Sequence, residues 1–165
     1  MSIEEFYKGA GSYIAQFNAF AEKHALVGIT GADHLCYKCG SVESFKEMRE
    51  MFEWTSEYTH QAIISGRRIA YIKLKKPIET VLGPIWFIEL SDQKQDNSQV
   101  DSYDHIEVFA TGISYDEMVD KLEQTETVTK TVRPHHTTHD IDMGDGFLFR
   151  CTQGPLIEKI KHEEM

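Results

Sequence analysis

Two histidine–glutamate pairs in this chain recur with a similar order and spacing. His34 is followed by Glu89, and His105 is followed by Glu158. Each histidine comes directly after an aspartate, and each glutamate follows an isoleucine in a run that begins with Gly-Pro. Two imidazoles and two carboxylates suit a divalent ion such as Zn, Ni, Mn or Fe, and an octahedral ion would keep two positions for water or substrate. The alternative is that all four are solvated strand residues.

Further polar residues could serve the same site. Glu107 shares a strand face with His105, so it is expected as a reserve ligand or a general base. Four residues are candidates for contacting a substrate or supporting the ligands: His60, Arg133, His135 and His139. Alternation places His135 and His139 on one face of their run, where they would line a pocket or form a plain polar edge strand.

The cysteines indicate no separate chemistry. Cys36 and Cys39 form a C-x-x-C pattern, but residues three apart on a strand point to opposite faces, and no second pair completes a zinc site. With Cys151 the number of cysteines is odd, which argues against a secreted disulfide framework. We therefore expect Cys36 and Cys39 to be reduced thiols on a half-buried strand.

The surrounding sequence predicts two similar β-α-β-β-β units behind an opening helix. Apolar residues at helical spacing, after a Ser2–Glu5 capping box, predict a helix over 2–25. The first unit is expected as strand 33–39, helix 41–54 and strands 58–64, 68–74 and 85–90. The second is expected as strand 103–110, helix 114–124, extended runs within 127–142 and strands 146–151 and 156–160.

This order predicts an α+β fold built from two tandem β-α-β-β-β units behind an N-terminal helix. Repetition of a short motif in matching strand contexts favours a duplicated unit over coincidence. The expected single structural domain, 1–165, divides into an N-terminal helix (1–30), a first unit (31–91), a polar connector (92–102) and a second unit (103–165).

The amino-acid composition limits the classes of molecule that this protein is expected to bind. The 165 residues include 17 Lys and Arg against 27 Asp and Glu, a net charge of −10, which disfavours nucleic acid. The 41% share of apolar residues suits a folded protein, yet no apolar run is long enough to cross a membrane. The opening MSIEEFYKGAG carries acids where a signal peptide carries bases. We expect a cytoplasmic monomer or homodimer that binds a small molecule.

The tandem units, with a histidine on each first strand and Gly-Pro…Ile-Glu on each last strand, resemble the vicinal-oxygen-chelate (glyoxalase, bleomycin-resistance and dioxygenase) superfamily. The opening helix, ADHLCYKC, DHIEV and GPLIEKI are most similar to its YecM-like branch of metal-binding proteins. The resemblance implies that the two units form an eight-stranded mixed sheet, which curves around a central cavity and encloses one divalent ion. It also implies that the ligands come from first and last strands, which here match His34, Glu89, His105 and Glu158.

The function expected from this resemblance is a metal-dependent lyase or isomerase. The ion would chelate two adjacent substrate oxygens and stabilise an enediolate, with Glu89 or Glu158 doubling as the general base. Two alternatives stay open: a metal-free protein that sequesters an apolar small molecule, and an extradiol-type iron dioxygenase.

Overall fold

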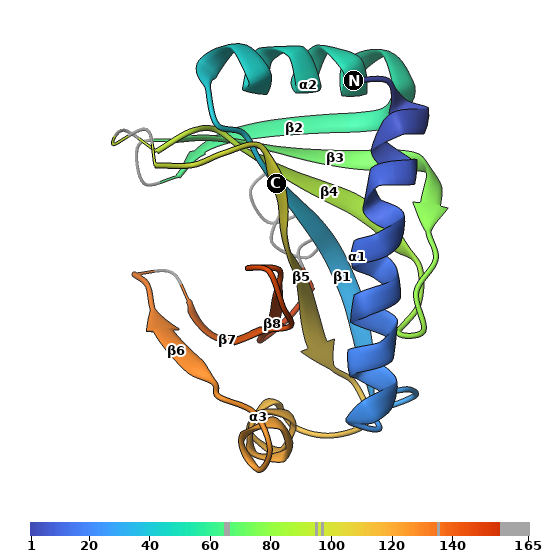
Figure 1. The fold of residues 1–165 in the computed structure, drawn as a ribbon, viewed down its shortest axis with the longest axis vertical. Helices are drawn as coiled ribbons and strands as arrows, with labels where there is room; N and C mark the ends of the chain where they lie inside the picture. The colour runs from blue at the N-terminus through green and yellow to red at the C-terminus, as the bar shows by residue number, and fades with distance from the viewer. Residues whose placement is uncertain (65–66, 95, 97, 135, 156–165) are drawn as a thin grey trace.

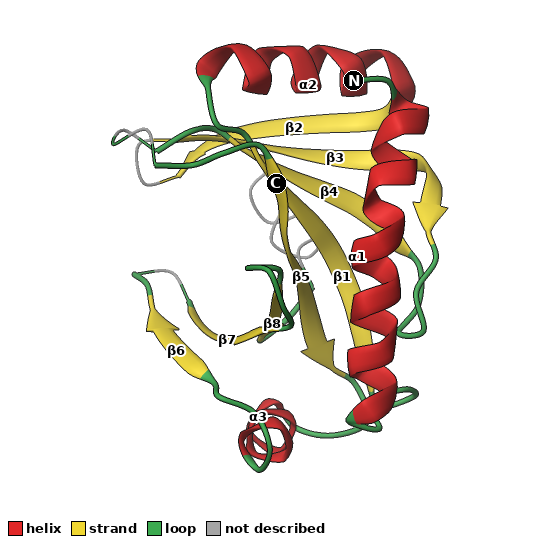
Figure 2. Cartoon of the chain, viewed as in Figure 1, coloured by secondary structure: helices red, strands yellow, loops and turns green. Residues whose placement is uncertain are grey.

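The computed structural model describes residues 1–155 except 65–66, 95, 97 and 135, and the side chains of 58–64 are also outside the description. Within these residues the chain has three helices and one open, eight-stranded mixed sheet (Figures 1 and 2). The helices are α1 (Ile3–Lys23), α2 (Val42–Thr55) and α3 (Tyr115–Glu123). The strands are β1 (Thr30–Lys38), β2 (Ser56–Ile64), β3 (Arg67–Ile78), β4 (Ile85–Ser91), β5 (Ser102–Ala110), β6 (Thr129–Val132), β7 (Thr137–Asp142) and β8 (Leu148–Thr152). The α+β prediction with an N-terminal helix is confirmed.

The sheet consists of two similar halves that meet at β1 and β5. Its strand order is β2-β3-β4-β1-β5-β8-β7-β6. β1 pairs in parallel with β4, β5 pairs in parallel with β8, and the two first strands pair antiparallel at the centre. β8 therefore takes the place beside β5 that β4 takes beside β1. The predicted final strand, 156–160, lies outside the described residues.

Serine side chains begin all three helices. Ser2 Oγ accepts a hydrogen bond from the backbone N–H of Glu5 at 3.1 Å. Ser41 and Ser114 each form reciprocal capping boxes with the residue three positions later, which satisfies N–H groups that have no partner inside the helix. No helix in the described part of the chain is long and apolar enough to span a membrane.

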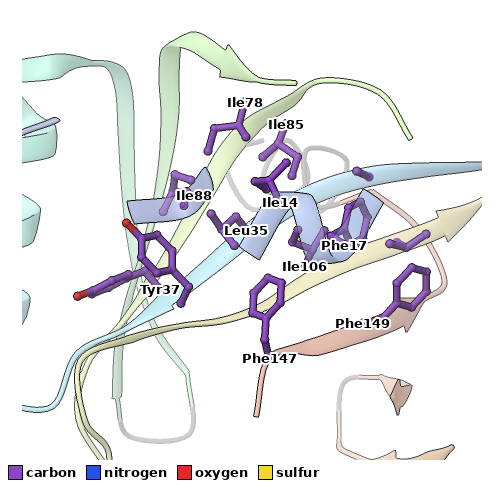
Figure 3. Close-up of a cluster of buried hydrophobic side chains, with 14 of the residues drawn as sticks. Ile14, Phe17, Leu35, Tyr37, Ile78, Ile85, Ile88, Ile106, Phe147 and Phe149 are labelled. Carbon is purple, nitrogen blue, oxygen red and sulfur yellow. The ribbon is translucent and has the colours of Figure 1, made fainter. Parts of the chain in front are cut away.

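Helix α1 covers one face of the sheet across the junction of the two halves (Figure 1). Near its start, the Phe6 ring lies 5.1 Å from the Phe52 ring of α2 in the first half. Further along, the Phe17 ring stacks at 5.6 Å on Phe149 of β8 in the second half. Figure 3 shows α1 side chains beside core residues of both central strands. The shared core leaves the opposite face of the central strands free of α1.

A β-bulge interrupts the ladder before each site histidine. Ala32 pairs with Val108 and His34 pairs with Glu107, so the register of the ladder shifts at Asp33, the one extra residue between them. The same irregularity occurs at Asp104 on β5. Because a bulge shifts the alternation, Ala32 belongs to the core while His34, two positions later, faces the opposite side of the sheet.

Candidate metal centre

Four side chains that can ligate a metal converge on the face of the central strands opposite α1. They are His34 from β1, Glu89 from β4, and His105 and Glu107 from β5, and one ligand atom from each lies within 4.8 Å of the others. The strand register explains the convergence: His34 pairs with Glu107, while Glu89 and His105 flank Cys36 from its two sides. Both imidazoles are almost fully buried, at 1% and 2% exposure.

An aspartate orients each imidazole. Asp33 Oδ2 lies 2.7 Å from His34 Nδ1, and Asp104 Oδ2 lies 2.7 Å from His105 Nδ1. A carboxylate on Nδ1 holds the proton there and leaves Nε2 to face the cluster, as in many metal sites. The sequence shows the Asp-His repeat, but the role of the aspartates depends on the two bulges, which alternation does not reveal.

Both carboxylates of the cluster contact the same imidazole nitrogen. His34 Nε2 lies 2.8 Å from Glu107 Oε2 and 2.9 Å from Glu89 Oε2. Burial lowers the pKa of His34, but the charge of Glu107 and the hydrogen bonds with Asp33, Glu107 and Glu89 outweigh it, and the pKa is raised well above its usual value. The raised pKa favours the protonated imidazole, whose single positive charge offsets one of the two carboxylate charges.

The cluster fits a divalent ion. The buried carboxylate of Glu107 and the partly buried one of Glu89 repel each other unless a positive charge lies between them, and a metal ion supplies more charge than one proton. The donor set of two imidazole nitrogens and two carboxylates suits borderline divalent ions. The cluster lacks a cysteine ligand, so it differs from the thiolate-rich structural zinc sites.

An arginine adjoins the cluster from β8. Arg150 Nε and Nη2 donate to the two carboxylate oxygens of Asp140 at 2.8 and 3.1 Å, and Nη1 lies 3.2 Å from His105 Nε2. Burial lowers the pKa of Arg150, but the bonds to Asp140 and its charge raise it further than burial lowers it. Local sequence patterns do not single out Arg150, because its partner Asp140 lies on another strand.

Cys36 lies at the edge of the same cluster. Its Sγ is 3.8 Å from Glu89 Oε1, and burial raises the pKa of the thiol well above its usual value. Cys36 also forms a second group of potential metal ligands with Asp104 and His105. Cys39, by contrast, belongs to the core on the other face, so the predicted opposite orientation of the two cysteines is confirmed.

The remaining predicted site residues lie in different places. Glu158 and His135 are outside the described residues. His60 pairs with Tyr71 in the ladder between β2 and β3, and its side chain is not described. The structure does not bring His139 to the cluster: its Nδ1 lies 2.6 Å from the hydroxyl of Tyr115 on α3.

Arg133 lies between β6 and β7. Its Nη1 donates to Thr138 Oγ1 at 2.6 Å. Thr138 and Asp140 alternate with His139 along β7, so their side chains share the other face of that strand, the one that carries Arg150. The polar run from 133 to 140 thus contributes Arg133, Thr138 and Asp140 to this face rather than the predicted histidine.

A cavity of about 480 Å³ lies beyond the cluster, toward the C-terminal ends of β5 and β8. Phe109 and Thr152 line it, and they follow Glu107 and Arg150 by two residues on the same strands. The Thr152 hydroxyl is buried and has no hydrogen-bond partner among the described residues. The cavity offers mainly apolar walls beside the ionic cluster.

Comparisons with known proteins agree with this architecture. The sequence model of the YecM protein family matches residues 5–145. A structural-genomics structure of protein EC4020 superimposes with a TM-score of 0.69 at 19% identity, over 96% of this chain and 92% of that one. A Streptomyces coelicolor methylmalonyl-CoA epimerase variant, in complex with 2-nitronate-propionyl-CoA, has a TM-score of 0.50 at 14% identity, over 79% and 98%. A search of curated protein sequences gives no significant match.

Proposed function

Since this chain belongs to the YecM family, a member of the vicinal-oxygen-chelate superfamily, we propose that it is a divalent-metal-dependent lyase or isomerase acting on a small substrate with two adjacent oxygens. The observation that carries the proposal is the convergence of His34, Glu89, His105 and Glu107. A neighbour of the same fold is an epimerase, but at 14% identity that likeness concerns the fold alone.

In this proposal His34, His105 and Glu107 hold the ion, and Asp33 and Asp104 fix the imidazoles. A bound divalent ion polarises substrate oxygens and so acidifies the neighbouring C–H group. Glu89 accepts that proton and returns it, because its side chain is more accessible than that of Glu107, at 18% against 10% exposure.

Elemental analysis of protein purified without chelators tests the proposal. We expect about one divalent ion per chain in the wild type and loss of most of it in His105→Ala. A matched control is His24→Gln, which changes another buried histidine that contacts a carboxylate, Glu126, outside the cluster. Absence of an ion, together with unchanged metal affinity in His105→Ala, would show that the proposal is wrong.

A second candidate is an extradiol-type iron dioxygenase, because two histidines and one glutamate also form the ligand triad of many non-haem iron oxygenases. Stoichiometric iron and oxygen uptake with catechols would select it. The mainly apolar cavity beside Phe109 supports a third, metal-free binding function. That function predicts thermal stabilisation by an apolar ligand that EDTA does not abolish.

A further inference from the structure

We propose that Arg133 and Arg150 form an oxyanion-binding subsite beside the metal centre, so that the substrate carries a carboxylate or phosphoryl group next to its chelating oxygens. This inference rests on the proposed function, because the ion sets which substrate atoms lie at the cluster. It extends the proposed function by specifying that the substrate is negatively charged.

Metal binding would free one donor of Arg150. In this structure Nη1 faces the Nε2 lone pair of His105, at 3.2 Å. Nδ1 of that ring is engaged with Asp104, so Nε2 is the atom left to ligate an ion. A ligated lone pair accepts no hydrogen bond, and a cationic N–H group in a largely buried side chain then lacks an acceptor. An oxygen of the substrate would restore one.

Arg133 supplies a second positive charge, which no direct carboxylate contact among the described residues offsets. Among the described residues its guanidinium has one side-chain partner, the neutral hydroxyl of Thr138, and forms no salt bridge with a carboxylate. Burial and the charge of Arg150 lower the pKa of Arg133 by more than the nearby carboxylate charges, that of Asp140 first, raise it. A bound anion would relieve the repulsion between these two guanidinium groups.

The strand that anchors both arginines sets their separation. Arg133 is bound by Thr138 and Arg150 by Asp140, and these two β7 residues are two positions apart on one face. Such residues lie roughly 7 Å apart along a strand. The guanidinium groups can therefore contact one oxyanion from two sides, while Glu107, the ladder partner of Arg150, reaches the ion.

Titration calorimetry with three small probes tests the subsite. Glycolate and hydroxymethylphosphonate both pair a hydroxyl with an anion, whereas ethylene glycol offers two adjacent oxygens without charge. We expect the metal-loaded protein to bind both anions and to bind ethylene glycol at least tenfold more weakly. The two anions distinguish a carboxylate from a phosphoryl preference. Arg133→Gln should weaken the preferred anion roughly tenfold to hundredfold.

Two further variants make the test specific. Arg49→Gln removes a guanidinium from α2, where Arg49 pairs with Glu53, and should change anion affinity less than twofold. Arg150→Lys retains the positive charge. It loses the planar guanidinium group, which contacts Asp140 and the site at the same time, so it should also weaken anion binding. Thermal melts before titration confirm that each variant is folded.

The outcomes separate the two proposals. Equal affinity for ethylene glycol, or unchanged anion affinity in folded Arg133→Gln, overturns the subsite even if the ion binds as proposed. Failure of the ion to bind overturns the proposed function instead. In that case phosphate titration of metal-free wild type and Arg133→Gln still decides the subsite: equal affinities or no binding would refute it.

Discussion

Arg150 on β8 occupies the position that Glu89 occupies on β4. Each lies two residues beyond the parallel-ladder partner of its own half's histidine, His34 for Glu89 and His105 for Arg150. The two similar halves of the sheet thus carry a carboxylate at one equivalent place and a guanidinium at the other. Glu107, from the central strand β5, brings the second carboxylate into the cluster. One side of the site is therefore suited to a cation and the other to an anion.

Metal removal is expected to lower the thermal stability of the protein. At a free metal concentration of one hundred times Kd, a ligand that binds only the folded state stabilises it by about 2.7 kcal/mol. For a chain of this size that raises Tm by roughly 5–10 °C. Calorimetry with metal and then with EDTA measures the shift. Glu107→Gln should abolish most of it, while Glu22→Gln, an exposed substitution on α1, should not.

Asp104→Asn should weaken metal binding without removing a ligand. The amide can donate to His105 Nδ1 where the carboxylate accepts, so the imidazole loses the partner that orients Nε2 toward the cluster. We expect a loss of about tenfold to hundredfold in metal affinity. Competition titration against a chelating dye measures it. Asp120→Asn, exposed on α3, is the charge-matched control, and an equal loss there would contradict the assigned role.

Two glycines of α1 should respond in opposite directions to alanine. A Cβ at Gly11 would meet nothing within 4 Å, so Gly11→Ala should raise the free energy of unfolding by about 0.5–1 kcal/mol. A Cβ at Gly9 would lie 2.6 Å from the hydroxyl of Tyr103, which donates to the carbonyl of Phe6. Gly9→Ala should therefore cost about 1–3 kcal/mol.

Urea unfolding of both glycine variants measures these changes. The control is Gly9→Ala in a Tyr103→Phe background, where the conflicting hydroxyl is gone and the cost of the alanine should fall. If Gly9→Ala proved as stabilising as Gly11→Ala, the close approach of α1 to β5 would be disproved.

Glu126 should contribute stability only above acidic pH. It contacts His24 at 2.8 Å and Lys23 at 3.4 Å. Burial raises its pKa, but the hydrogen bonds with those two residues and their charges lower it below the usual 4.5. The contribution is therefore complete above the unfolded-state pKa and is lost as the pH falls through the folded-state value. Because Lys23 is exposed and Glu126 lies at the surface, solvent screens these charges, and the contribution amounts to at most about 1 kcal/mol.

Melting curves of wild type and Glu126→Gln between pH 7 and pH 3 check this prediction. The variant should melt slightly lower at pH 7, and the two curves should merge as the pH approaches 3. Glu123→Gln, which is exposed on α3, should match the wild type throughout. A difference that grows toward acid would contradict the direction of the pKa shift.

Local patterns were sufficient to predict much of the fold. A capping box marked the start of the first helix, and alternation correctly placed Glu107 on the strand face of His105, opposite the core residue Ile106. Three of the four cluster residues were predicted as ligands, and the fourth, Glu107, as a reserve. These features depend on residues near one another in sequence, which is why they could be read from it.

The rest depends on pairing between distant strands. The second Gly-Pro…Ile-Glu run suggested Glu158 as the partner of Glu89, and that prediction lies outside the described residues. Within them, the register of β5 against β8 gives Arg150 the position equivalent to that of Glu89, which no local pattern indicated. Alternation correctly placed His139 on the opposite face of β7 from Thr138 and Asp140. It could not indicate which of the two faces contacts α3. A strand's own sequence specifies two faces and not what covers each of them.

The bulges at Asp33 and Asp104 each add one residue to a strand that is otherwise regular. Deleting that residue would close the ladder and leave every other side chain on its present face, with the core residues still inward and the histidine still outward. A strand can therefore acquire a carboxylate behind its histidine through a single-codon insertion. The apolar half of the strand needs no compensating substitution, so the chemistry of this face can change while the core is conserved.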